Sequence, residues 1–263
     1  MKKLYIVFDQ IPSKESGGLI ATYFNLVKLL DQDFEIHIVS IFNTNKKNKN
    51  LFDQYPIHVV DKNLIDMLFY KIFSYLLKEK NIKNVNIVEK DIMNIDYITE
   101  ELDGIFSSFT IAYFPNDMKK VIENWAGKLK SGGWIALIEI DDLLRGHQPL
   151  SEENFGKLAR YEEHIKESGK YDFQAGRKIK NILKRLDMEI IIEKDLEDIE
   201  LTASGIMSDE VFELWKNRLD RLNISKYYPE KISQEIKKEL LSLFKSAEHE
   251  NNTKVKFIVA KKI

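Results

Sequence analysis

The sequence contains no cysteine. Disulfide bonds, thiolate zinc sites and a cysteine nucleophile are therefore excluded, and a reducing cytoplasm suits the chain. An excess of charge of either sign is also missing, because 40 Lys and Arg residues face 42 Asp and Glu residues, for a formal net charge of -2. Without a basic field to hold a phosphate backbone, no nucleic-acid partner is expected.

Long hydrophobic runs are missing too. A spanning helix needs about 18 or more consecutive apolar residues, so no membrane span is expected. The apolar run at residues 4–8 is too short for a secretory signal, and Asp9 interrupts it, so a first β-strand is expected there instead. The 263 residues, 44% of them hydrophobic, are enough to bury a core in one large domain or two small ones. We expect a cytoplasmic protein.

Short apolar runs that alternate with helical patterns predict an α/β fold with a mostly parallel sheet. Strands are expected at 4–9, 35–42, 57–61, 85–91, 104–109, 134–141, 188–196 and 254–262. Helices are expected at 19–31, 63–79, 116–130, 152–168, 174–187, 208–222 and 230–247. The helix at 116–130 is expected to end at Ser131-Gly132-Gly133, where a glycine can adopt the left-handed conformation.

The segment from Asp103 to Asp141 contains a strand, a helix, a Leu-Lys-x-Gly-Gly turn and a second apolar strand. In order and spacing it resembles the fourth strand, following helix and fifth strand of class I S-adenosylmethionine-dependent methyltransferases. The strands at 188–196 and 254–262 are similar to the antiparallel pair that closes the sheet of that family. This resemblance implies a Rossmann-like sheet with helices on both faces. It also implies helical lid insertions and an antiparallel last strand between its neighbours.

The same resemblance implies S-adenosyl-L-methionine as cofactor and a small-molecule methyl acceptor. Asp91 matches the acidic residue beside the adenine, with Ile92 packing on the ring, although Asp91 could instead cap a helix. Ser107 and Phe109 end the next strand, where the family contacts the methionine part and the substrate; a polar strand end and a core ring are the alternatives. Asp61, if it ends the family's second strand, would hold the ribose hydroxyls, unless it caps the following helix.

His147 is the candidate general base, because an imidazole pKa suits proton removal from a hydroxyl or an amine. A locally hydrogen-bonded loop histidine is the alternative. Asp141 and Asp142 lie close to it in the sequence, but the spacing of the three residues matches no metal-ligand pattern. No metal site is therefore expected.

Candidate substrate-binding residues are Tyr113, Tyr161 and Arg177. The resemblance places Tyr113 in the loop near the cofactor, and Tyr161 and Arg177 among the helices that cover the active site. An arginine could bind an acceptor carboxylate through two parallel hydrogen bonds. A solvated or salt-bridged helix face is the alternative for Tyr161 and Arg177.

The glycine-rich loop D-x-G-x-G-x-G, which follows the first strand of class I methyltransferases, does not occur here. The first strand, Gly17-Gly18 and the following helix instead resemble the start of a GT-B glycosyltransferase of family 4. We therefore divide the chain into a Rossmann-like, glycosyltransferase-like part at 1–80 and a methyltransferase-like part at 81–263. Gly17 and Gly18 would serve the cofactor only if their loop folds back to the end of the first strand.

A methyltransferase with impaired cofactor binding is the favoured function. The loop after the first strand carries Pro12, Lys14 and Glu15, which put bulk where the cofactor would lie. A glycosyltransferase-like protein that binds a nucleotide sugar is the second candidate, but the acidic E-x(7)-E motif of that family is not visible. A non-catalytic chimera or remnant is the third. The sequence does not indicate the acceptor or the oligomeric state.

Overall fold

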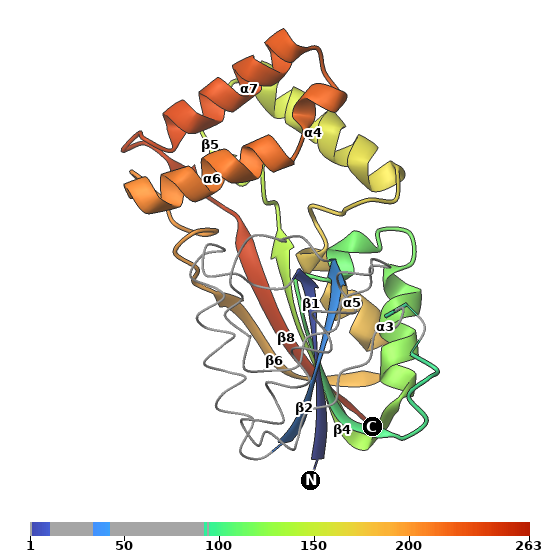
Figure 1. Ribbon diagram of the computed structural model, residues 1–263. Helices are drawn as coiled ribbons and strands as arrows, with labels where there is room; N and C mark the ends of the chain where they lie inside the picture. The colour runs from blue at the N-terminus through green and yellow to red at the C-terminus, as the bar shows by residue number, and fades with distance from the viewer. Residues whose placement is uncertain (1, 11–33, 43–91, 94) are drawn as a thin grey trace, which may run out of the picture.

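The computed structural model describes residues 2–10, 34–42, 92–93 and 95–263. Most of its strands form a single sheet (Figure 1). The strands of this sheet are β1 (Lys2–Gln10), β2 (Phe34–Phe42), β3 (Leu102–Ser108), β4 (Leu129–Asp141), β6 (Met188–Leu196) and β8 (Lys254–Lys262). Two short strands, β5 (His147–Gln148) and β7 (Glu250–Asn251), pair separately.

The sheet has the order β2-β1-β3-β4-β8-β6. The pairs β1–β2, β1–β3 and β3–β4 are parallel, whereas β8 runs antiparallel to both of its neighbours, β4 and β6. This confirms the expected α/β fold, including the antiparallel last strand between its neighbours. Strands from both sides of residue 80 belong to the one sheet.

The helices of the described residues fall into two groups (Figure 1). Their bounds are α3 (Met118–Gly127), α4 (Glu152–Glu167), α5 (Gly176–Arg185), α6 (Asp209–Arg221) and α7 (Glu230–Leu243), with 3-10 turns η1 (Ile111–Tyr113) and η2 (Ile224–Lys226). Helices α3 and α5 lie along the sheet. Helices α4, α6 and α7 form a helical cap beyond the carboxyl ends of the parallel strands.

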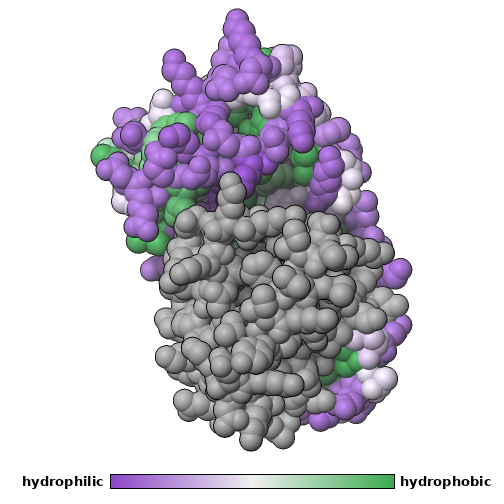
Figure 2. All heavy atoms as spheres, viewed as in Figure 1, coloured by the Kyte–Doolittle hydropathy of each residue, from purple (hydrophilic) through white to green (hydrophobic). Residues whose placement is uncertain are grey.

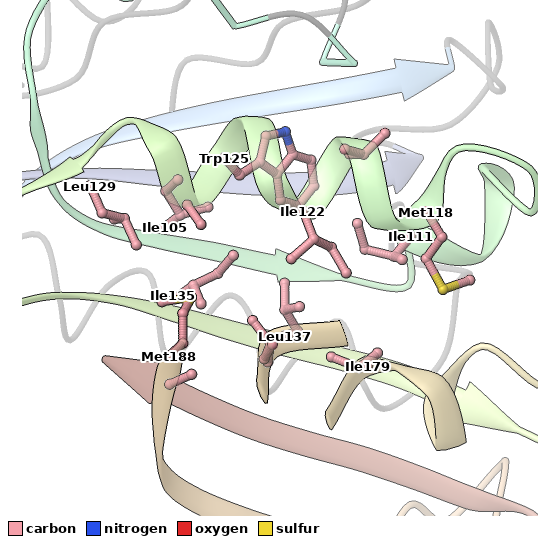
Figure 3. Packing of buried hydrophobic residues seen from close by; sticks show 14 of the residues in the cluster. Ile105, Ile111, Met118, Ile122, Trp125, Leu129, Ile135, Leu137, Ile179 and Met188 are labelled. Atoms are coloured by element: carbon pink, nitrogen blue, oxygen red, sulfur yellow. The ribbon is translucent and has the colours of Figure 1, made fainter. Parts of the chain in front are cut away.

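The core between the sheet and helices α3 and α5 is apolar (Figure 3). Alternate residues of a strand point to opposite faces, so Ile135 and Leu137 of β4 meet Ile122 and Trp125 of α3 on this side. The Trp125 side chain is 1% exposed, and its Nε1 donates a hydrogen bond to the carbonyl of Ile92 at 2.8 Å. This bond ties the segment that precedes β3 to the helix.

A second core joins the cap to the other face of the sheet. Ile138 and Ile140, near the carboxyl end of β4, belong to the same cluster as Trp215 of α6 and Leu240 of α7, so this core continues from the sheet into the cap. Ser151 and Ser208 begin α4 and α6 as N-caps, each accepting a hydrogen bond from the backbone three residues later. The visible face of the cap is mostly hydrophilic (Figure 2).

The boundary between α3 and β4 differs from the sequence prediction. The helix ends at Gly127, and residues 131–133 belong to β4. Leu129 already pairs with Leu102 in the β3–β4 ladder, so strand pairing takes over before the glycines. Gly132 does adopt a left-handed φ of 77°, close to the irregularity in the register between Leu102 and Gly104.

The other predicted elements that lie within the described residues agree with the structure within a few residues, and β6 and β8 have the predicted bounds. The short elements β5, β7, η1 and η2 were not predicted. The elements expected at 19–31, 57–61, 63–79 and 85–91 lie outside the described residues. Among the described helices, none combines the length and the apolar character that a membrane crossing requires.

Candidate functional site

The carboxyl ends of β3 and β4 lie at the edge of the sheet that faces the cap (Figure 1). Ser107, near the end of β3, is paired in register with Val7 of β1 and Leu137 of β4. Its side chain is 1% exposed, and its hydroxyl has no hydrogen-bond partner in the described part of the chain. A buried hydroxyl without a hydrogen-bond partner is energetically unfavourable, so a ligand group that hydrogen-bonds to Ser107 would stabilise the protein.

Both strands end in a non-glycine residue with a left-handed backbone. Phe109 follows β3 with φ 51°, and Asp142 follows β4 with φ 59°. The amide of Phe109 donates to the carbonyl of Ile138 at 2.8 Å, which fixes this sharp turn. Such conformations are costly for a bulky residue and gather at functional sites. The two adjacent turns therefore make this edge of the sheet a candidate functional site.

Glu139 of β4 supports the turn after β3. Its side chain is fully buried, and Oε1 accepts hydrogen bonds from the amides of Ile111 at 2.5 Å and Ala112 at 3.4 Å. Thr110 donates from its hydroxyl to the carbonyl of Ser108 at 3.0 Å. The segment after β3 is thus held by a carboxylate from the neighbouring strand.

An ion-pair cluster follows the end of β4. Arg177 at the start of α5 donates from Nε to Asp141 at 2.6 Å and also pairs with Asp142. Burial raises the pKa of Asp141, although the hydrogen bond and the charge of Arg177 act in the opposite direction. Gln174 adds a hydrogen bond from Nε2 to Asp142 at 3.0 Å. The guanidinium predicted to bind substrate is therefore engaged by two carboxylates.

A second guanidinium lies between this cluster and the cap. Arg145 donates from Nε to Oε2 of Glu162 at 2.6 Å, and one of its terminal nitrogens lies 3.7 Å from Asp142. Burial raises the pKa of Glu162 to about 7, with the charge of Arg145 opposing the shift. The other oxygen of Glu162, Oε1, is buried and has no partner among the described residues.

The predicted substrate residues Tyr113 and Tyr161 are linked by ring contacts. Tyr113 packs edge-on against Tyr171 with ring centroids 4.9 Å apart, and Tyr171 contacts Phe173 at the same distance. Phe173 lies 6.0 Å from Tyr161, whose hydroxyl donates to the carbonyl of Leu222 at 2.6 Å. An aromatic series therefore runs from the turn after β3 into the cap.

His147 lies inside the cap and is fully buried between Trp215 and Phe244. Its Nδ1 is 2.9 Å from Nε2 of His249, whose Nδ1 is 2.9 Å from the carbonyl of Gly205. A carbonyl can only accept, so with both rings neutral the proton of His147 is on Nδ1. Burial, followed by the charges of His249 and Arg218, lowers the pKa of His147 to about 3.

The structure thus separates the predicted residues. Ser107 and Phe109 are adjacent at the strand edge, Tyr113 and Tyr161 belong to one aromatic series, and His147 is within the cap core. Ile92 is buried in the core beside α3. The predicted residues Gly17, Gly18, Asp61 and Asp91 lie outside the described residues.

Sequence reasoning missed Glu139, Arg145, Glu162 and His249. An acidic residue in the apolar run WIALIEID was a signal for Glu139, because a charge in a buried strand needs partners. Glu162 and His249 lie in polar sequence and gave no comparable signal. Their partners are 17 and 102 residues away, respectively.

Comparison with protein families matches residues 63–137 to the methyltransferase domain, a minority of the chain. Comparison with curated proteins gives no significant match. A solved structure from Galdieria sulphuraria, described as a sarcosine dimethylglycine methyltransferase, is similar with 13% identity and a TM-score of 0.51. That match covers 99% of this chain and 77% of the other.

Two further solved structures are similar at lower TM-scores. Geranyl diphosphate C-methyltransferase from Streptomyces coelicolor has 10% identity and a TM-score of 0.49, covering 100% of this chain and 73% of the other. The cyclopropane synthase MmaA2 from Mycobacterium tuberculosis has 12% identity and a TM-score of 0.48, covering 100% and 79%. At such identities the likeness concerns the fold alone. The chain therefore has the Rossmann-like fold found in methyltransferases, with a methyltransferase-domain match over residues 63–137.

Proposed function

We propose that the protein is an S-adenosylmethionine-dependent methyltransferase that acts on a small-molecule acceptor and binds its cofactor weakly. The observation that carries the proposal is the arrangement of the sheet. Its antiparallel strand lies between β4 and β6, and its parallel strands end in the strained turns at Phe109 and Asp142. In open α/β sheets, ligands bind at the carboxyl ends of the strands. The family match over residues 63–137 supports the same function.

The described residues fit a cofactor at this edge. The buried hydroxyl of Ser107 has no partner there, and with Phe109 it would contact the methionine part. Asp91 and Ile92 would hold the adenine, and Asp61 the ribose. Gly17 and Gly18 would approach the cofactor if their loop folds back. When bound, the cofactor supplies an electrophilic methyl group, and the protein contributes mainly alignment.

Acceptor binding is assigned to Tyr113, Tyr161 and Arg177, and proton removal to His147. The geometry sets a condition on each role. Arg177 would bind an acceptor carboxylate in competition with Asp141 and Asp142. His147 would act only on an acceptor that enters the cap, because its ring is fully buried, and only as a weak base, because burial lowers its pKa to about 3. A cytoplasmic location, the absence of a nucleic-acid partner and the division into parts 1–80 and 81–263 belong to the same proposal.

Calorimetric titration of the full chain with S-adenosylhomocysteine and, separately, with uridine diphosphate tests the proposal. We expect the first to bind with a Kd of tens of micromolar or poorer, which corresponds to roughly -6 kcal/mol, and the second not to bind. Binding of uridine diphosphate alone would favour the glycosyltransferase-like alternative. Binding of neither would favour a non-catalytic protein, and a sub-micromolar Kd would mean that the Gly17-Gly18 loop completes the site.

The variant Asp91→Ala tests the adenine assignment. Loss of a charged hydrogen-bond acceptor should weaken S-adenosylhomocysteine binding by about 1–3 kcal/mol while leaving folding nearly intact. Asp96→Ala is the matched control, because the Asp96 side chain is 80% exposed and pairs with Lys128 at 3.4 Å on the surface. Equal affinities of the two variants would remove Asp91 from the site.

A further inference from the structure

Glu162 combines burial with an unused oxygen. Its side chain is 6% exposed, Oε2 accepts from Arg145, and Oε1 is buried without a partner in the described part of the chain. A carboxylate oxygen is a strong acceptor, so leaving one buried and unbonded is costly unless a ligand supplies a donor. The proposed function gives this oxygen no role.

An aromatic ring stands beside the same ion pair. Phe155 lies two helical turns before Glu162 on α4, which places both on one side of the helix. The guanidinium of Arg145 lies 5.5 Å from the centre of the Phe155 ring. Phe155 is 37% exposed, so the guanidinium that pairs with the buried carboxylate also lies beside an apolar ring that is open to solvent.

The surrounding charges are unequal. Four carboxylates, those of Asp141, Asp142, Glu162 and Asp195, face three cations, those of Arg145, Arg177 and Lys256. The cluster therefore carries one uncompensated negative charge when Glu162 is ionised. A partly buried cluster with this excess of negative charge favours a monovalent cation, and an organic ammonium adjacent to an aromatic ring gains further attraction.

We propose that Glu162, positioned by Arg145, binds the protonated amine of a small organic molecule together with Phe155. The ammonium donates a hydrogen bond to Oε1 of Glu162, and its apolar part packs against the Phe155 ring. In the methyltransferase, this amine-bearing molecule is the acceptor, and that identification rests on the proposed function. The cation site itself does not depend on the cofactor.

Benzylamine is the probe, because it joins an ammonium to an aromatic ring, and benzyl alcohol is its uncharged counterpart. We expect benzylamine to bind the wild-type full chain in a calorimetric titration, with Glu162→Gln weakening it about 10- to 100-fold, the range for a charged hydrogen bond. Glu163→Gln is the matched control, because Glu163 is exposed and pairs only with Lys166 in the described structure. Its affinity should equal that of the wild type.

Titration across pH keeps the proposal testable if Glu162→Gln fails to fold. The charged groups that face Glu162 are Arg145 and Asp142, with Tyr161 beside it on α4. Because burial raises the pKa of Glu162 to about 7, benzylamine should bind wild-type protein roughly tenfold more tightly at pH 8 than at pH 6. A flat pH profile would overturn the proposal. So would equal binding of benzyl alcohol, undiminished binding to folded Glu162→Gln, or no binding of benzylamine to the wild type.

S-adenosylhomocysteine titration separates this inference from the proposed function. The Glu162→Gln variant should bind S-adenosylhomocysteine within about twofold of the wild type, because Glu162 lies in the cap and not at the strand ends. If S-adenosylhomocysteine binds neither protein, the methyltransferase proposal fails. The benzylamine result still decides the Glu162 site.

Discussion

The two cores of the molecule differ in what they bury. The core between the sheet and helices α3 and α5 is built from aliphatic residues and Trp125, whereas the cap contains the buried polar residues His147, Glu162 and His249. Buried polar groups cost free energy unless they are fully hydrogen-bonded. The first region therefore provides rigidity, whereas the cap carries the groups that respond to ligands and pH.

The largest expected effect concerns the apolar core. Trp125→Ala should lower the free energy of unfolding by about 3–5 kcal/mol, because it leaves a large cavity and removes the hydrogen bond to Ile92. Urea unfolding measures the change, and it should be the same at pH 5 and pH 8. The exposed Lys119→Ala is the control and should stay within about 0.5 kcal/mol of the wild type. If the loss in free energy of unfolding for Trp125→Ala depended on pH, the apolar core would not differ from the cap in its response to pH.

The junction between sheet and cap gives the next effect. A Cβ at Gly146 would lie 2.6 Å from both the carbonyl oxygen of Asp142 and the amide nitrogen of Thr253. Gly146→Ala should therefore lower the free energy of unfolding by about 1–3 kcal/mol. Gly156→Ala is the control, because a Cβ there meets nothing within 4 Å. Equal thermal stability of the two variants would contradict the tight packing at Gly146.

His147 makes the cap sensitive to acid. Its pKa is about 3 in the folded protein and about 6.5 when unfolded, so the unfolded state binds more protons between these values. The contribution of His147 is complete above pH 6.5 and should fall by about 1.4 kcal/mol per pH unit below it. His147→Asn keeps a donor toward His249 and should flatten this dependence in denaturant titrations. An unchanged slope would show that other groups dominate.

Glu162 has the opposite sign, which matters for that measurement. Its pKa is raised to about 7, so the folded state holds the extra proton between the ordinary carboxyl value and pH 7. This contribution favours the fold at low pH and is lost as pH rises through 7. The effect of His147 should therefore be taken as the difference between the wild type and His147→Asn, in which Glu162 is common to both.

The smallest effect tests the strand edge. Ser107→Ala removes a buried hydroxyl that has no partner among the described residues, so it should raise the free energy of unfolding by about 1 kcal/mol and weaken S-adenosylhomocysteine binding. Ser108→Ala, at a position equally buried, is the comparison and should give no such gain. Thermal unfolding and calorimetry measure the two effects. A gain in stability without any loss of binding would remove Ser107 from the cofactor site.

Regular elements were predictable where local pattern and pairing agree. The apolar runs in MEIIIEKDL and KVKFIVAKK gave β6 and β8 with their bounds, and the resemblance gave their antiparallel placement. The end of α3 was wrong because Leu129 pairs with Leu102, a contact that no local pattern records.

Less of the candidate site than of the fold could be predicted from the sequence. Ser107 and Phe109 were identified because strand ends are visible in a sequence, and their binding roles stay predictions. The Arg145–Glu162 and His147–His249 pairs form only when distant segments meet, so neither residue type nor spacing pointed to them.

The two chain segments that connect sheet and cap next to Gly146 are fastened to each other. The hydroxyl of Thr253 donates to the carbonyl of Asp142 at 2.9 Å, and the amide of Asn252 donates to the carbonyl of Gly146 at 2.7 Å. A single connecting segment would allow the cap to rotate relative to the sheet, whereas two segments that are hydrogen-bonded to each other resist that rotation. Access to the strand edge is therefore expected to depend on side-chain rearrangement along α4 and the turn after β3, on a faster timescale than the rocking of whole domains.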